Sequence, residues 1–261
     1  MQDLKELRKE IDVIDNTLLE ALKKRFDITR RIGEYKAETG AELFCPEREA
    51  EKLDSLRDIL KGCEYSPYVV DMFRCVMDYS KYQQSNDIFG TKDIYLIGMP
   101  GCGKSHIGSV LSNKMQRIFI DMDSLYEQVF EISPEKEIET NKEDFFRNRE
   151  SELLSDICAK KYGTVTGDTV RGRVISCGGG IVCRQLNKDL IKKDSVVIYI
   201  KRDLDKLDVN GRPLSKQNRI EELFKARKEK YEDFSDISFE NKGSIEDCVK
   251  EILEALKKMN R

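Results

Sequence analysis

The chain has 261 residues and a formal net charge of −3, with 39% hydrophobic and 36% charged residues. This length leaves room for one large domain or two of moderate size, and the charge gives no basic footprint for nucleic acid. No window approaches the roughly 18 apolar residues of a membrane helix. The start "MQDLKELRKE" lacks the apolar core of a secretory signal. We therefore expect a cytoplasmic globular protein with neither nucleic acid nor membrane as a partner.

Cysteines are frequent, and they raise the question of a metal site or a disulfide framework. The sequence has eight cysteines but no CxxC pair, and its single histidine is His106. The usual Cys/His zinc ligand sets are therefore missing. In a cytoplasmic chain we expect most of these cysteines to be buried free thiols.

The sequence changes in character near "QQSNDIFGTKD", residues 83–93. Strand signals are almost absent before this stretch. After it, short β-branched runs alternate with helical stretches, as in "DIYLIG", "RIFIDMD", "RVISCGGG", "SVVIYI" and "DISFE". Strands separated by helices predict βαβ units and a parallel sheet covered on both faces. We predict an all-helical domain over 1–86 and an α/β domain over 90–261.

The first 36 residues carry an apolar heptad seam over about five repeats. Its members are Leu4, Leu7, Ile11, Ile14, Leu18, Ala21, Ile28, Ile32 and Tyr35. A single helix of this length, on the order of 50 Å at 1.5 Å per residue, cannot bury that stripe within one small domain. We predict that a partner chain covers it, forming a homodimer. Two further helices are expected over about 46–61 and 66–85.

Polar residues stand at positions of this helical pattern that can face one another. Arg25 falls on a core position of the seam, where an unpaired charge is costly, so it must meet an anion or a carboxylate. Together with other polar groups it can surround a small dianion inside an all-helical dimer. The alternative is a plain coiled-coil dimerisation module in which Arg25 pairs with a carboxylate. The other polar groups are Lys36, Arg48, Glu49, Ser80 and Gln84.

The stretch "LRKEIDVIDNTLLEALKKRFDITRRIGEYKAETG", followed by "PERE", resembles the AroQ class of chorismate mutases. The resemblance implies an intertwined dimer of three-helix chains that rearranges chorismate to prephenate without a cofactor. It assigns Arg25, and Arg8 from the other chain, to the two carboxylates of chorismate. It assigns Lys36 and Gln84 as donors to the ether oxygen. It places Arg48 and Ser80 beside a carboxylate, and it makes Glu49 the acceptor for the ring hydroxyl.

One position departs from the family pattern, because Cys45 stands where an acidic residue is usual. The rearrangement needs a substrate held in its reactive folded form and donors that stabilise charge on the breaking ether oxygen. The alternative is a catalytically silent regulatory dimerisation module that binds prephenate or an aromatic amino acid. Cys45 is the best support for that alternative, whereas the other matched polar residues argue against it.

The segment "GMPGCGKS", residues 98–105, reads G-x-x-x-x-G-K-S between a predicted strand and a predicted helix. Backbone N–H groups of such a loop cradle nucleotide phosphates, Lys104 reaches the transferred γ-phosphate and Ser105 ligates Mg²⁺. The motif predicts ATP binding but does not identify the acceptor. The predicted ATP-binding residues are Gly98, Gly101, Cys102, Gly103, Lys104, Ser105 and His106.

Further candidate residues follow this loop. "IDMD" places Asp121 and Asp123 on one side of a strand end, where one can hold Mg²⁺ and the other can accept a proton from a hydroxyl. "FFRNRE" offers Arg147, and "SCGGGIV" offers three glycines that permit close backbone approach to a ligand. "NGRPLS" places Arg212 in a loop suited to a mobile lid. Taken singly, each is also compatible with an ordinary turn or a solvated arginine.

In this order, and with "RKEKY", these segments resemble the shikimate kinases over about residues 93–255. The resemblance implies transfer of the ATP γ-phosphate to the 3-hydroxyl of shikimate. It assigns Arg147 and Arg227 to the shikimate carboxylate and Asp123 to the attacking hydroxyl. It makes Arg212 the lid residue over ATP and assigns Ser105 and Asp121 to the Mg²⁺ site. The glycines that it assigns to shikimate binding are Gly178, Gly179 and Gly180.

The two resemblances together predict a bifunctional enzyme of aromatic amino acid biosynthesis that acts on chorismate, shikimate and ATP, with Mg²⁺ at the kinase site. The departures from the kinase pattern are mild, with Cys102 and Cys177 at positions of small residues and His106 where threonine is common. A different acceptor, gluconate or a nucleoside monophosphate, is the alternative for the kinase. Arg147 and Arg227 favour a carboxylate acceptor, which includes gluconate.

Overall fold

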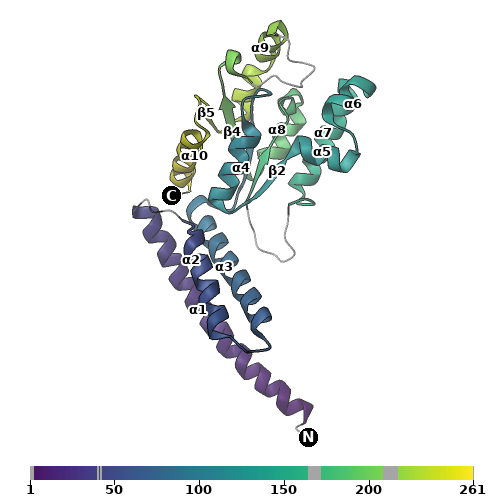
Figure 1. Cartoon of the computed structure of the whole chain (residues 1–261). Helices are drawn as coiled ribbons and strands as arrows, with labels where there is room; N and C mark the ends of the chain where they lie inside the picture. The colour runs from purple at the N-terminus through teal and green to yellow at the C-terminus, as the bar shows by residue number, and fades with distance from the viewer. Residues whose placement is uncertain (1–2, 40, 42, 164–171, 208–216, 261) are drawn as a thin grey trace. The chain divides into compact units, whose positions relative to one another are not determined.

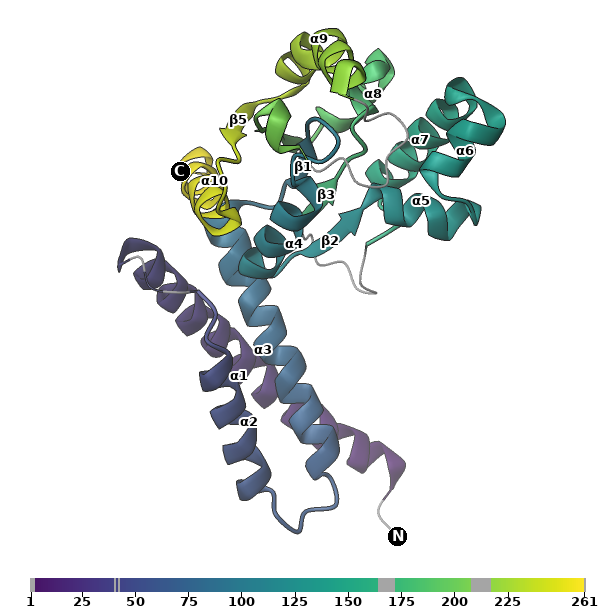
Figure 2. The same cartoon turned by 45° about the horizontal axis from the view of Figure 1, so that its top comes forward.

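The computed structural model describes residues 3–39, 41, 43–163, 172–207 and 217–260 (Figures 1 and 2). The chain divides into two compact units, Met1–Ile88 and Phe89–Arg261. Among the described residues, no helix is both long and apolar enough to cross a membrane.

The N-terminal unit is all-helical, as predicted, and contains α1 (Leu4–Thr39), α2 (Pro46–Ile59) and α3 (Ser66–Phe89). Pro46 starts α2, where its missing N–H has no intrahelical partner to lose. Figure 2 shows the three helices side by side, with α3 against the other two. The contact between α1 and α3 is close, because an ideal Cβ at Gly33 would lie 3.0 Å from Cγ of Gln84.

One face of α1 remains uncovered in the single chain. Gly33 is the residue of this helix that is buried, while the apolar seam that we expected to need a partner is open to solvent. Its exposed members lie between 39% and 65% accessible and are Leu4, Leu7, Ile11, Ile14, Leu18, Ile28, Ile32 and Tyr35. An apolar stripe of this extent is characteristic of a surface that another molecule covers.

The C-terminal unit is built on a five-stranded parallel sheet, which confirms the predicted α/β fold. The strands are β1 (Asp93–Ile97), β2 (Ile118–Asp121), β3 (Arg173–Ser176), β4 (Ser195–Lys201) and β5 (Ile237–Glu240), in the order β2-β3-β1-β4-β5. All residues of β1 are buried, as expected for the central strand. The strands β2 and β3 lie on one side of β1, and β4 and β5 lie on the other. The carboxyl end of β1 is therefore at a switch point, where such sheets bind ligands.

Helices connect and cover the strands. They are α4 (Lys104–Met115), α5 (Met122–Phe130), α6 (Pro134–Asn141), α7 (Glu143–Cys158), α8 (Gln185–Ile191), α9 (Gln217–Phe234) and α10 (Ile245–Met259), with short 3₁₀ turns η1 (Ile181–Cys183) and η2 (Leu204–Lys206). The helix α4 packs against α10 and β3, α7 packs against α6 and α8, and α9 packs against η1 and β4. The helices α4 and α5 follow β1 and β2 in the chain, so both begin at the carboxyl edge of the sheet.

All eight cysteines are free thiols. The expectation that most are buried is wrong, because only Cys102, Cys177 and Cys248 are. Three exposed ones, Cys45, Cys63 and Cys75, belong to the helical unit. That unit is too small and too open as a single chain to enclose them.

A buried ion pair joins β1 and β3 at their amino ends. Nη2 of Arg173 lies 2.5 Å from Oδ2 of Asp93, and the backbone N–H of Arg173 donates to Oδ1 at 2.7 Å. The guanidinium, 1% exposed, also donates to the carbonyls of Ile157 and Tyr162. The pair therefore fixes the register of two neighbouring strands.

Removing one partner of this pair should destabilise the α/β unit strongly. In Asp93→Ala the buried guanidinium of Arg173 has no counter-charge, so the free energy of unfolding should fall by about 3–5 kcal/mol. Urea unfolding of the full chain, followed by far-UV circular dichroism, measures this loss.

The matched control is Asp203→Ala, which removes an ion pair to Lys206 whose two side chains are 67% and 52% exposed. That change should lower the stability far less than Asp93→Ala does, because water screens the exposed pair. Equal effects of the two substitutions would contradict the importance of the buried pair.

Candidate active site

The loop between β1 and α4 can be formed only with glycine at particular positions. Gly98 and Gly103 have φ angles of 147° and 98°, values that side chains rarely tolerate. An ideal Cβ on Gly98 would lie 2.4 Å from the carbonyl oxygen of Ile200, and one on Gly103 would lie 2.7 Å from Nδ2 of Asn241. Asn241 in turn donates to the carbonyl of Cys102 at 2.9 Å. The loop is therefore pinned to the ends of β4 and β5.

The first residues of α4 project polar groups from this loop. Lys104 is buried, and its ammonium donates to the carbonyls of Gly98 and Met99 at 3.1 and 3.0 Å. Oγ of Ser105 donates to Oδ2 of Asp121 at 2.6 Å. His106, the next predicted residue, is exposed on the first turn of α4. The structure thus joins the end of the loop to the end of β2.

The predicted placement of Asp121 and Asp123 on one side of a strand is wrong. The strand β2 ends at Asp121, and Asp123 already belongs to the first turn of α5. Asp121 caps this helix, because its Oδ1 accepts the backbone N–H groups of Asp123 and Ser124, each at 3.1 Å. The cap is compatible with the contact to Ser105, which uses the other carboxylate oxygen. The chain therefore starts a helix capped by Asp121 and does not continue as a strand.

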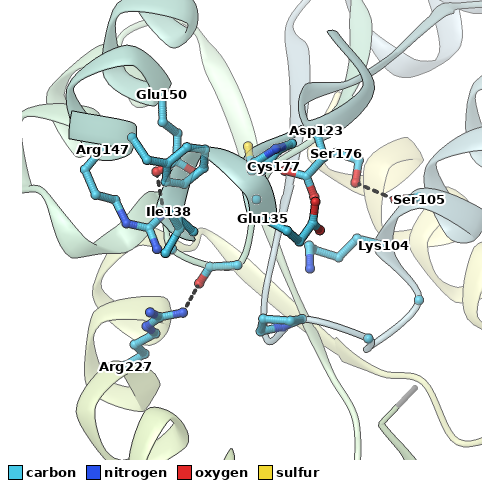
Figure 3. Close-up of a pocket in the computed structure, with 18 of the residues that line it drawn as sticks. Lys104, Ser105, Asp123, Glu135, Ile138, Arg147, Glu150, Ser176, Cys177 and Arg227 are labelled. Atoms are coloured by element: carbon cyan, nitrogen blue, oxygen red, sulfur yellow. Dashed lines mark hydrogen bonds and ion pairs between the residues drawn. The ribbon is translucent and has the colours of Figure 1, made fainter. Parts of the chain in front are cut away.

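A cavity of about 320 Å³ opens at this edge of the sheet. Residues from the loop, α5, α6, α7, α9 and the segment after β3 line it. Figure 3 shows Arg147 and Arg227 on one side of the cavity and Lys104 and Ser105 on the other. Asp123 is exposed and lines the same cavity. The cavity thus combines an anion-binding wall with the phosphate-type loop.

Arg147 is held on α7 between two carboxylates. It is 6% exposed, and its Nη1 donates to Oε2 of Glu150 at 2.7 Å. Its Nε and Nη2 donate to Oε1 of Glu143 at 3.3 and 3.0 Å. Burial lowers the pKa of Arg147, but the Glu150 and Glu143 carboxylates more than compensate, so the net pKa is raised. Burial also raises the pKa of Glu150, against the opposing effect of Arg147. Arg147 therefore keeps its charge at the cavity wall.

The three glycines after β3 lie close to side chains of the cavity wall and of the loop. An ideal Cβ on Gly180 would lie 2.1 Å from the Arg147 guanidinium, and one on Gly179 would lie 2.6 Å from the Pro100 ring. An ideal Cβ on Gly178 would lie 2.7 Å from Oε1 of Glu150. Nη1 of Arg227 donates to the Gly179 carbonyl at 3.0 Å. A side chain at position 178 or 180 would displace Glu150 or Arg147 from its present place, and one at position 179 would collide with Pro100.

The helical unit brings together part of its predicted polar set. Arg25 donates to Oγ of Ser80 and, at 3.2 Å, to the carbonyl of Val76. Nε2 of Gln84 donates to the carbonyl of Thr29 at 2.9 Å. Burial lowers the pKa of Arg25. These contacts form a polar cluster where α1 meets α3.

The remaining predicted residues of this unit lie around or outside that cluster. Lys36 donates to the carbonyl of Leu43 at 2.8 Å, and Arg48 pairs at the exposed surface with Glu51. Arg8 lies on α1 seventeen residues before Arg25, about 25 Å along the helix at 1.5 Å per residue. A single chain therefore does not bring Arg8 to the cluster.

Sequence reasoning missed three charged residues at these sites. Glu143 and Glu150 stand four residues before and three after Arg147, the helical spacings at which side chains meet, so this signal was available. Lys81 pairs with Glu49 at 2.9 Å, across thirty-two positions of sequence. No local pattern marks that contact. Arg212, the predicted lid arginine, lies outside the described residues.

The donor set suits a magnesium ion held together with a nucleotide. Within the described residues, no group of three or more His, Cys, Asp and Glu side chains is arranged to hold a metal. The Ser105 hydroxyl and the Asp121 carboxylate nevertheless lie together at the end of the loop. One or two such oxygens, completed by phosphate and water oxygens, are the usual protein contribution to Mg²⁺ sites of this kind.

Comparisons with known proteins find a family match for each of the two parts of the chain. The family model for shikimate kinase matches residues 100–257, and that for chorismate mutase type II matches residues 7–85. A shikimate kinase from Clostridium botulinum is 37% identical over 165 residues, covering 61% of this chain and 93% of that enzyme. A bifunctional shikimate kinase/3-dehydroquinate synthase from Thermotoga maritima is 33% identical over 168 residues, covering 62% of this chain and 32% of that protein.

The fold comparison concerns the α/β unit. A structure of shikimate kinase from Acinetobacter baumannii in complex with shikimate matches with a TM-score of 0.60, at 23% identity, over 67% of this chain and 98% of that one. This likeness shows the fold. With the family matches, it confirms both resemblances found in the sequence. A chorismate mutase type II domain comes first along the chain, and through the domain that follows it the chain belongs to the shikimate kinase family.

Proposed function

We propose that this chain catalyses two reactions of aromatic amino acid biosynthesis. The C-terminal domain, residues 90–261, transfers the γ-phosphate of ATP to the 3-hydroxyl of shikimate. The N-terminal domain, residues 1–86, rearranges chorismate to prephenate. The observation that carries the kinase proposal is a single cavity with a phosphate-type loop on one side and two buried arginines on the other. The polar cluster around Arg25 carries the mutase proposal.

In the kinase reaction, Arg147 and Arg227 bind the shikimate carboxylate and so orient the ring. Asp123, on the first turn of α5, accepts the proton of the 3-hydroxyl as its oxygen bonds to the γ-phosphorus. The bond from that phosphorus to the β,γ-bridging oxygen breaks, and ADP leaves. Lys104 exchanges its loop carbonyls for phosphate oxygens and balances their charge. Mg²⁺ bound by Ser105 and Asp121 would add positive charge beside the phosphates.

Other residues proposed at this site act on the nucleotide and the ring. The backbone N–H groups of the loop surround the phosphates, and Arg212 closes over ATP. The glycine segment after β3 lets the substrate approach the backbone. A gluconate or nucleoside monophosphate acceptor is less compatible with the family match, which is to shikimate kinase over residues 100–257.

In the mutase reaction, the protein contributes a charged clamp. Arg25 binds one carboxylate of chorismate, with Ser80 and Arg48 beside it, and Glu49 accepts from the ring hydroxyl. Lys36 and Gln84 donate to the ether oxygen, on which negative charge grows as the C–O bond breaks and the new C–C bond forms. No proton transfer or covalent intermediate is needed. The alternative is a silent ligand-sensing domain, which the unusual Cys45 still favours.

We also propose that the mutase site is shared between two chains of a homodimer. The exposed apolar face of α1 supports a helical partner. The separation of Arg8 from Arg25 along the same helix supports a site in which the partner's Arg8 binds the second carboxylate. A twofold arrangement of antiparallel helices would place two such sites symmetrically.

The kinase proposal is tested by Asp123→Asn, which removes the proton acceptor while keeping the size of the side chain. Shikimate-dependent ADP release should fall by about 10²–10⁴-fold, and ATP binding should be kept. Lys104→Ala should instead impair phosphoryl transfer because the contact of Lys104 with the nucleotide phosphates is lost. Near-normal turnover in Asp123→Asn would refute its role. Release of ADP by the wild type with gluconate or a nucleoside monophosphate, but not with shikimate, would refute the acceptor.

The mutase proposal is tested in the full chain by Arg8→Ala and Arg25→Ala. Each homodimer should be nearly inactive toward chorismate but retain shikimate-dependent ADP release, which is the folding control for the α/β domain. Unchanged helical content by circular dichroism is the folding control for the helical domain. Refolding the two variants together should restore about a quarter of the wild-type mutase rate, because random twofold pairing gives half mixed dimers, each with one intact site.

Three outcomes separate the alternatives for the N-terminal domain. If mixed dimers form and activity does not return, each site is built from one chain. If the wild type leaves chorismate unchanged, the domain is the silent regulatory module. If Arg8→Ala alone remains active, Arg8 has no part in the clamp.

A further inference from the structure

Glu143, the first residue of α7, contacts both arginines of the proposed shikimate site. Its Oε1 lies 3.0 Å from Nη2 of Arg147 and 3.9 Å from Nη2 of Arg227. The two guanidinium groups therefore converge on one oxygen atom of a protein carboxylate. This is the arrangement that a substrate carboxylate would require of them.

Glu143 also occupies the edge of Arg147 that is best suited to a carboxylate. A guanidinium binds a carboxylate through two parallel N–H groups on one edge. Nη1 of Arg147 is engaged by Glu150 at 2.7 Å, and both Nε and Nη2 are engaged by Glu143. The Nε/Nη2 edge is thus already in use, and an incoming carboxylate can take it only if Glu143 leaves.

The charge of the cluster leads to the same conclusion. Arg147 and Arg227 carry two positive charges, and Glu143 and Glu150 formally carry two negative ones. A further carboxylate added to this balanced set would introduce an excess negative charge into a wall whose arginines are 6% and 5% exposed. An unbalanced charge in such surroundings is costly. Departure of one glutamate removes that cost.

The structure indicates which of the two glutamates can depart. The side chain of Glu150 is 4% exposed and lies against the glycine segment. The side chain of Glu143 is 50% exposed, so it can rotate into water without a change in the backbone. Its place at the start of a helix favours a negative charge in either orientation. Glu150 is therefore the fixed counter-charge and Glu143 the exchangeable one.

We propose that Glu143 is an internal carboxylate that holds the place of the substrate carboxylate. Binding of shikimate exchanges one carboxylate for the other on the same two arginines, and Glu143 then lies in solvent. This inference rests on the proposed shikimate site. The exchange lowers the affinity for shikimate and disfavours small inorganic anions, which have no ring contacts to compensate for displacing Glu143.

The test is Glu143→Gln in the full chain, which keeps the shape of the side chain and removes its charge. Calorimetric titration with shikimate should show a dissociation constant about two- to fivefold lower than in the wild type, the range expected for a partly exposed ion pair. The KM for shikimate should fall with it, and kcat should stay within about twofold. Inorganic sulfate should compete with shikimate more strongly in the variant than in the wild type.

The matched control is Asp144→Asn, which removes one charge from the next position of the same helix start. Asp144 is exposed and, unlike Glu143, forms no ion pair with either arginine, both of which are described. The affinity of the Asp144→Asn variant for shikimate should equal that of the wild type. Glu143→Ala provides a second variant without the carboxylate and should tighten binding in the same direction.

Other outcomes would overturn the proposal. Weaker shikimate binding in Glu143→Gln would mean that Glu143 supports the geometry of Arg147 rather than competing for it. Unchanged binding would mean that the ion pair contributes nothing, and equal tightening in Asp144→Asn would assign the effect to long-range charge. If the wild type itself fails to bind shikimate, the proposed kinase acceptor is wrong, which is a distinct result.

Discussion

A buried guanidinium group is costly unless carboxylates or other acceptors compensate its charge, and this requirement shapes the cavity of the kinase domain. Arg147 is buried and stays charged because Glu150 and Glu143 surround it. At Gly178 and Gly180 a Cβ would meet Glu150 and Arg147, respectively, and at Gly179 it would meet the Pro100 ring. The binding wall is therefore a consequence of how one positive charge is neutralised.

The sequence predicts those parts of the fold and site that local patterns encode. The strands, the phosphate-type loop and the three N-terminal helices all follow from short-range periodicity and spacing. Asp121 shows the limit of this reasoning, because a strand end and a helix cap use the same residue type, and only the backbone path of the next turn separates them. Lys81 shows a further limit, since its pairing with Glu49 depends on the packing of α2 against α3. Glu143 was readable from helical spacing, but its contact with Arg227 was not.

The two domains differ in how completely one chain forms them. The α/β domain buries its central strand and encloses its cavity with its own helices. The helical domain leaves the apolar stripe of α1 open, and Arg8 lies far along that helix from the polar cluster around Arg25. The same feature, a helix too long for its own domain, accounts for both observations. The proposed second chain would cover the hydrophobic surface and would also complete the proposed site.

In both domains the cations that we propose to bind anions contact groups of the protein itself. Arg25 donates to Ser80, Lys36 to a carbonyl of its own unit, Lys104 to the carbonyls of its loop, and Arg147 to two glutamates. These partners differ in charge, and therefore in how strongly they compete with a substrate anion for the cation. Replacing a neutral hydroxyl or carbonyl by a carboxylate or phosphate strengthens the hydrogen bond to the cation. Replacing Glu143 by a substrate carboxylate exchanges one carboxylate for another. In the proposed kinase site, the wall formed by Arg147 and Arg227 is thus the place where substrate binding would gain least from charge, and selectivity would depend on contacts of the ring with the rest of the cavity.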